Sequence, residues 1–131
     1  MITFKIVKKK SPTDSTVQKF YPVLLSSGYT DLDNVAARIS EVCTVSVHDV
    51  KGVLQALEQQ LSATLQEGKS VRLGTLGSFH IRVNSKRGGK TSADDVKTDD
   101  VASLRIHFSK SPRLRRAFKR TNSALKFRQQ A

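Results

Sequence analysis

Residues 68–79, with the sequence GKSVRLGTLGSF, constrain the fold of this chain more than any other stretch. Gly68 follows a long amphipathic helical pattern, and a glycine just past a helix suits the left-handed conformation that ends it. From Val71 onward apolar and polar residues alternate, which is typical of a half-buried strand. Gly74 and Gly77 bracket a tight turn, after which the alternation resumes. The sequence therefore predicts a β-hairpin attached to the end of a helix.

Two helices are predicted before this hairpin. The first covers about residues 32–42, where Thr30 followed by Asp33 resembles a capping arrangement. The second begins after Ser46, a good N-cap, and carries an apolar stripe about five turns long. The residues of this stripe are Val50, Val53, Leu54, Leu57, Leu61 and Leu65.

The stripe is too wide to be covered by one short helix and a thin sheet. We therefore expect a homodimer in which the helices of two copies build a shared core. The alternative is a monomer in which the N-terminal strands cover the stripe. The only cysteine, Cys43, excludes an intrachain disulfide, and its place near the end of the first helix predicts core packing.

The sequence also predicts elements before the two helices and after the hairpin. Before the helices, a strand pattern starts at residue 2 and ends in the lysines at residues 8–10. A second extended stretch covers residues 17–25, and the two would pair with each other. After the hairpin come an aspartate-rich region, which holds a possible short helical turn at residues 92–96, and a strand at residues 104–108. A final helix would start at Ser111 and Pro112. Its apolar side would carry Leu114, Ala117, Phe118 and Leu125.

The charge of the chain indicates a polyanionic partner. The net charge is +12, the pI is near 10.3, and no acidic residue follows Asp100. Further basic groups lie at residues 8–10 and 86–90, and nucleic acid is the commonest polyanion for such a protein. An anionic membrane surface is the rival partner. The sequence has no apolar run of about 20 residues and no signal-peptide core, so we expect a cytoplasmic protein without a membrane partner.

An enzyme is the least supported class of function. His48, His80 and His107 are scattered along the sequence, and no catalytic residue is predicted. The segment at residues 88–91 lacks the first glycine of a phosphate-binding loop, so neither a nucleotide nor a small-molecule substrate is expected. The aspartates after the hairpin lack the spacing of a calcium loop, and we predict no metal and no cofactor.

From about residue 32 to residue 118 the chain resembles the HU/IHF family of bacterial histone-like DNA-binding proteins. The resemblance rests on the order of the elements and on the pattern Gly-Lys-x-Val-x-Leu-x-x-x-Gly-x-Phe, which starts at Gly68. The segment at residues 87–90 stands where the family has an Arg-x-Gly-Arg segment in its arm. The resemblance implies an α+β fold: an intertwined dimer with a helical base, β-ribbon arms and a C-terminal helix.

The expected domain organisation follows from this resemblance. Residues 1–29 would form an N-terminal extension of two strands packed on the domain, as in a variant branch of HU-like proteins. Residues 30–120 would form the DNA-binding domain, and residues 121–131 a basic tail. The partner subunit would be the same chain or a paralogue.

The resemblance further implies a nucleoid protein that binds double-stranded DNA with weak sequence preference and bends or compacts it. Binding would use phosphate contacts and minor-groove insertion. The arm would contribute Arg82, Lys86, Arg87 and Lys90. The body would contribute Arg105, Lys110, Arg113, Arg115 and Arg116.

The chain departs from the family pattern at the arm tip. Thr91 and Ser92 replace the usual Asn-Pro, so the proline wedge that kinks DNA is missing. Four aspartates follow, and they would repel phosphates. The alternative function is therefore an HU-like interaction protein with degenerate arms that docks a protein partner. RNA binding is a third possibility, although stacking platforms of aromatic residues are absent.

Overall fold

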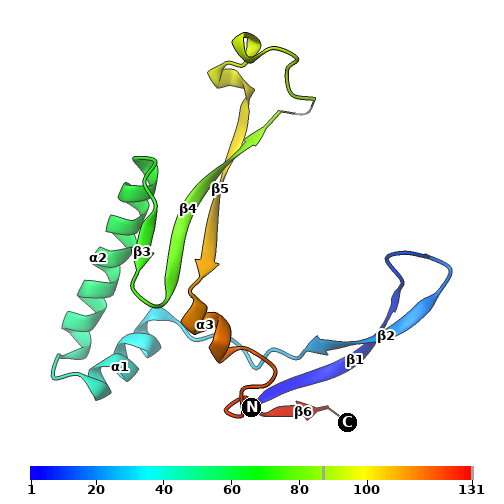
Figure 1. The fold of residues 1–131 in the computed structure, drawn as a ribbon. Helices are drawn as coiled ribbons and strands as arrows, with labels where there is room; N and C mark the ends of the chain where they lie inside the picture. The colour runs from blue at the N-terminus through cyan, green and yellow to red at the C-terminus, as the bar shows by residue number, and fades with distance from the viewer. Residues whose placement is uncertain (87, 131) are drawn as a thin grey trace. The chain divides into compact units, whose positions relative to one another are not determined.

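The computed structural model describes residues 1–86 and 88–130, and it has an α+β fold with three α-helices and two three-stranded sheets among these residues (Figure 1). The chain divides into two compact units. Leu32–Ala117 form a continuous central unit. Met1–Asp31 and Phe118–Ala131 together form a terminal unit, so the two ends of the sequence belong to one body.

The central unit opens with a pair of helices, α1 (Leu32–Val42) and α2 (Val47–Gln66). An ion pair of 2.6 Å between Lys51 and Asp33 links them. The predicted cap of α2 is confirmed, because the hydroxyl of Ser46 accepts a hydrogen bond of 3.2 Å from the Asp49 backbone N–H. Gly68 has φ +80° beyond the end of the helix, as predicted.

The sheet of the central unit has the strand order β3-β4-β5, and all its pairs are antiparallel. Strand β3 (Val71–Leu73) is short and pairs only with the start of β4 (Gly77–Ser85). Strand β5 (Val101–Lys110) pairs with the whole of β4, with a bulge at its outer end. The predicted strand at residues 104–108 therefore extends further in both directions. Strands β4 and β5 continue beyond β3 as a two-stranded ribbon (Figure 1). We call the whole β4–β5 pair, Gly77–Ser85 with Val101–Lys110, the ribbon.

Helix α3 (Pro112–Ala117) is shorter than the sequence predicts. Its cap is confirmed, since Ser111 accepts a hydrogen bond of 3.0 Å from the Leu114 backbone N–H. The placement of Phe118 and Leu125 on this helix is wrong. The side chain of Asn122 accepts a hydrogen bond of 3.0 Å from the Ala124 backbone N–H, and such local turns compete with helix continuation.

The sheet of the terminal unit has the order β2-β1-β6. Strand β1 (Ile2–Lys10) pairs antiparallel with β2 (Gln18–Leu24), which confirms that the two predicted strands meet. The first strand ends in the lysines at residues 8–10, as predicted, and these pair with residues 18–20 of β2. Strand β6 (Phe127–Gln129) then pairs parallel with the start of β1. The division at residues 29 and 120 stays a proposal.

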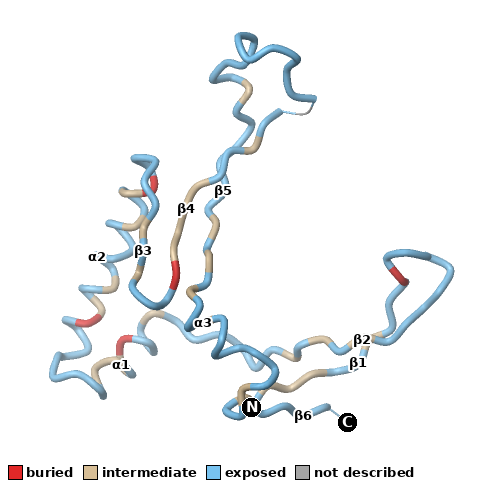
Figure 2. Tube along the Cα trace, in the orientation of Figure 1, coloured by how far each residue is buried: buried red, intermediate tan, exposed pale blue. Residues whose placement is uncertain are grey.

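The hydrophobic core within a single chain is small. The only hydrophobic side chains buried among the described residues are Ala36, Val50 and Leu65. Figure 2 shows that most of the trace is exposed or half-buried. Cys43 is exposed, so its predicted packing in a core is wrong for the single chain.

Candidate nucleic-acid interface

The ribbon has two chemically different faces, because side chains alternate along each strand and the register pairs like with like. On one face Phe79 meets Phe108, with ring centroids 4.9 Å apart. Further out on the same face lie the pairs Ile81 with Ile106 and Val83 with Leu104. This face is apolar, and much of it is exposed, with Ile106 at 71 %.

The opposite face is polar and basic. Its pairs, from the base outward, are Ser78 with Ser109, His80 with His107, Arg82 with Arg105, and Asn84 with Ser103. The imidazole rings lie 4.8 Å apart, and the amide of Asn84 donates a hydrogen bond of 2.9 Å to the Ser103 hydroxyl. Strands β4 and β5 contain no acidic residue. The face therefore offers cations and hydrogen-bond donors to an anion.

The two arginines at the centre of this face need a negative partner. Arg82 and Arg105 stand directly opposite each other, and like charges in that position destabilise a sheet. A phosphate group beside each guanidinium group would offset the repulsion and accept charge-assisted hydrogen bonds. The register thus brings together one residue that the sequence assigned to the arm and one that it assigned to the body.

The surroundings of His107 on this face lower the pKa of its imidazole. Partial desolvation lowers this pKa below its ordinary value of 6.5, and the positive charge of Arg82 and the neighbouring His80 lower it further. A bound phosphate would act in the opposite direction by favouring the protonated ring.

The tip of the ribbon, residues 86–100, mixes basic and acidic groups. Two short 3₁₀ turns, Ala93–Asp95 and Thr98–Asp100, confirm the helical turn predicted here, although Ser92 makes no capping side-chain hydrogen bond. Lys90 lies 3.8 Å from the carboxylate of Asp100, so part of its charge is neutralised. The backbone N–H of Lys86 donates to the carbonyl of residue 100.

The remaining predicted residues lie in three places. Arg87 is outside the described residues. Lys110, at the end of β5, stands opposite Gly77 on the same side of the strand as Phe108. Arg113, Arg115 and Arg116 are exposed on α3, which Ser111 anchors through a hydrogen bond to the Thr75 carbonyl. The structure therefore groups Arg82 with Arg105 and leaves the residues of α3 as a separate basic element.

The histidines are scattered along the sequence, but the strand pairing places His80 directly opposite His107. The pairing of Phe79 with Phe108 fixes the register, and the cross-strand pairs from Gly77 to Asn84 follow from it by counting, up to the bulge. Asn84 and Ser103 were not predicted as site residues, because the cross-strand pairs had not been worked out from the sequence. The polar and apolar residues of the two strands alternate with the same phase, and this alternation could have identified the pairs.

An apolar groove lies on the other side of the ribbon, between it and α2. Its volume is about 600 Å³, and its apolar lining comes from Leu65 on α2 and from the outer ribbon residues. Within the described part of the chain, no cluster of three acidic, histidine or cysteine side chains is arranged to hold a metal ion. None of the helices among these residues has the length and apolarity that crossing a membrane requires.

Comparisons with known proteins agree with this geometry. Residues 1–126 match the model of a family described as an HU domain fused to a wHTH, Ig or glycine-rich motif. The fold is similar to a crystal structure from Bacteroides vulgatus that carries the provisional description of a bacterial DNA-binding protein. The TM-score is 0.60 at 16% identity, over 98% of this chain and 47% of that one, so the chain spans about half of that structure. No curated protein matches the sequence.

Proposed function

Because the chain belongs to the family of HU domains fused to a wHTH, Ig or glycine-rich motif, we propose that it binds double-stranded DNA and that the polar face of the ribbon is the main contact. The observation that carries this proposal is the cross-strand pair of Arg82 and Arg105, flanked by His80 with His107 and by Asn84 with Ser103. A two-stranded ribbon is narrow enough to follow a groove of DNA. The provisional description of the similar structure agrees with this partner.

The contact is mainly with the DNA backbone. The paired guanidinium groups bind phosphates, and only Asn84 and Ser103 have side-chain amide or hydroxyl groups at the outer end of this face. Sequence preference is therefore weak, and binding depends on how easily the DNA deforms. The arginines of α3, together with Lys86 and Lys110, add phosphate contacts. The protein acts in the nucleoid and bends or compacts DNA without a proline wedge at the tip.

A homodimer, or a heterodimer with a paralogue, completes this arrangement. The exposed apolar side chains of α2 and of the ribbon call for a second chain: Val53 is 67 % exposed and Leu104 is 61 % exposed. In such a dimer two ribbons engage one duplex. The symmetry doubles the number of phosphate contacts without any new type of site.

The experiment that tests this function is fluorescence anisotropy of the protein on a labelled duplex over a salt series. In the variant Arg82→Gln/Arg105→Gln, the slope of log K against log salt should fall by about 1.8 for each copy of the chain, because two phosphate contacts are lost. The matched control is Arg38→Gln/Lys69→Gln, which removes the same charge from exposed positions outside the ribbon. An unchanged slope in the ribbon variant would contradict the proposal.

The second candidate function is docking of a protein partner. The acidic, compact tip with Asp94 and Asp95 favours it, since carboxylates oppose binding to phosphates. This function predicts negligible binding to DNA even at low salt. The salt series on the unmodified protein therefore separates the two functions before any variant is made.

A further inference from the structure

The terminal unit carries more of the positive charge than its size suggests. It holds nine basic residues and only two acidic ones, Asp14 and Asp31, which is +7 of the total +12. Strands β1, β2 and β6 contain no acidic residue. The basic residues of both chain ends meet here because β6 pairs with β1.

The strand register sorts these charges onto the two faces of the sheet. Lys5 and Lys9 lie on the same face of β1, and Lys19 stands directly opposite Lys9 on β2. Arg128 on β6 is the partner of Thr3 and extends this face to the other end of β1. Among the described residues, no ion pair involves any of these four basic side chains. We call Lys5, Lys9, Lys19 and Arg128 the terminal basic face.

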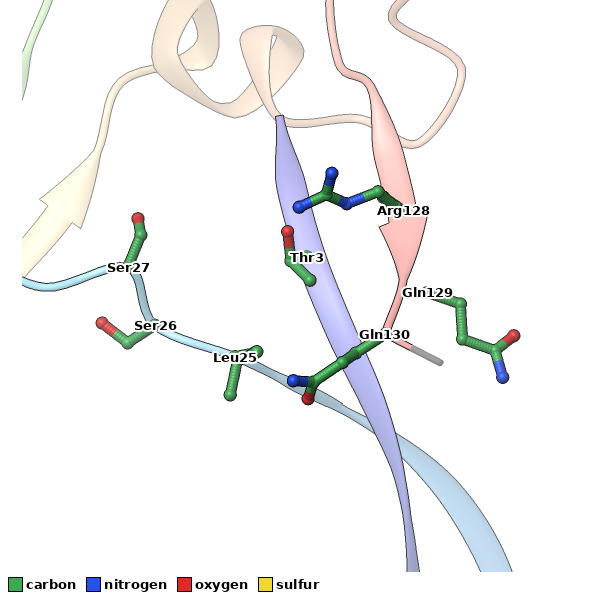
Figure 3. A pocket seen from close by; sticks show the side chains of 7 residues that line it. All are labelled: Thr3, Leu25, Ser26, Ser27, Arg128, Gln129 and Gln130. Carbon is green, nitrogen blue, oxygen red and sulfur yellow. The ribbon is translucent and has the colours of Figure 1, made fainter.

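The end of this face at Arg128 is hollowed. Figure 3 shows the guanidinium of Arg128 extending toward Thr3, while Gln130 points to the same side of the strands as Ser26 and Ser27. The lining supplies the guanidinium of Arg128, the amide of Gln130 and three hydroxyls, whereas the side chain of Gln129 points away (Figure 3); it contains no carboxylate. Guanidinium and hydroxyl donors around an open hollow suit a phosphate group, which arginine binds through two parallel hydrogen bonds.

We propose that the terminal basic face is a second DNA-backbone contact surface, separate from the ribbon, with Arg128 binding a phosphate in the hollow and the lysines continuing the track. From Thr3 to Lys9 the face is about 20 Å long, six residues at ~3.3 Å each. This length corresponds to about six steps of a DNA duplex. The inference rests on the proposed function, because it takes DNA to be the polyanion.

A duplex is favoured over an anionic membrane by what lies between the lysines. The apolar side chains on this face, Val7, Tyr21 and Val23, are half-buried and offer nothing to insert into a bilayer. The strongly exposed apolar residues of the sheet, such as Phe20 at 69 %, lie on the other face. Apolar insertion and basic charge on the same side together strengthen binding to a membrane surface, and this face supplies only the charge.

Strand β1 offers a matched pair of variants that tests the inference. Lys5→Gln/Lys9→Gln removes two charges from the terminal basic face, and Lys8→Gln/Lys10→Gln removes two from the opposite face of the same strand. In anisotropy titrations of the full chain on a labelled duplex, the first variant should lower the salt slope by about 1.8 per copy. The second should lower it by clearly less.

The outcomes separate this inference from the proposed function. If Lys5→Gln/Lys9→Gln keeps the full slope while Arg82→Gln/Arg105→Gln loses it, the terminal basic face is not used and the ribbon function stands. If only the terminal variant loses slope, the inference stands and the ribbon function fails. The same proteins are also mixed with phosphatidylserine vesicles. Loss of vesicle binding in the terminal variant, with DNA binding unchanged, would assign the face to a membrane and overturn the inference.

Discussion

Single residues matter here mainly through the partner that the strand register gives them. Arg82 and Arg105 repel each other across the ribbon, and His107 lies within the field of Arg82 and next to His80. Each of these groups is less favourable in the free protein than it would be beside an anion. In the proposed complex, relief of this repulsion by phosphate groups would contribute to the binding energy for DNA.

The lowered pKa of His107 predicts that DNA affinity depends on pH. Its pKa is lowered in the free protein, and a phosphate would raise it, so binding takes up a proton and DNA affinity should increase as pH falls from about 7 to 5. His107→Gln should flatten this dependence in titrations at constant ionic strength. His48→Gln, outside the ribbon, should not. For folding the sign is opposite: the lowered pKa stabilises the folded state above pH 6.5, and this stability is lost as pH falls through the folded pKa.

At the scale of elements, the hairpin of β4 depends on close packing at its first residue. Gly77 is buried, and a Cβ built on it would overlap the carbonyl oxygen of Ser109 and lie 2.7 Å from two ring carbons of Phe108. The ring of Phe108 also packs on Phe79. The base of the ribbon therefore has no room for a side chain at this position.

Gly77→Ala should destabilise the protein by about 1–3 kcal/mol, because the methyl group forces β4 and β5 apart. Gly52→Ala is the control: Gly52 lies inside α2 with no atom within 4 Å of a new Cβ, so alanine should stabilise by roughly 0.5–1 kcal/mol. Urea denaturation followed by circular dichroism measures both. Equal stability of the two variants would show that the hairpin base is not closely packed.

The elements differ in how far the sequence could predict them. The cap at Ser46, the turn at Gly68 and the strands of the hairpin follow from neighbours in the sequence, and they were predicted. The pairing of β6 with β1 joins residues more than 120 positions apart, and no local pattern marks a three-residue strand. The length of α3 was overestimated because apolar spacing continued past a turn that Asn122 stabilises. The exposure of Cys43 was not predicted, because the apolar spacing of a helix does not identify the surface that packs against it.

For the molecule as a whole, a single chain leaves many apolar side chains exposed to solvent. The apolar stripe of α2 was expected to exceed what one chain covers, and its members Val53 and Leu57 are 67 % and 40 % exposed. Apolar side chains of the ribbon are exposed as well. A second copy that packs against these surfaces would bury them, and each Å² of buried apolar surface would stabilise the dimer by about 25 cal/mol.

Val53→Asp/Leu57→Asp should therefore convert a dimer into monomers, since it places four charges in the shared core of the proposed dimer. Gln55→Asp/Gln59→Asp adds the same charge on the opposite side of α2 and should leave the dimer intact. Sedimentation velocity at micromolar concentration measures both variants. A monomeric unmodified protein would contradict the shared core directly.

The parallel pairing of β6 with β1 also sets an order of events during synthesis. The central unit is continuous in sequence and can fold as soon as residue 117 has left the ribosome. Strand β1 emerges first, yet one of its edges waits for residues 127–129, which are made more than 100 residues later. Contacts of such high sequence separation form slowly. This edge of β1 is thus open until residues 127–129 have been made, and the terminal sheet is completed after the central unit can fold.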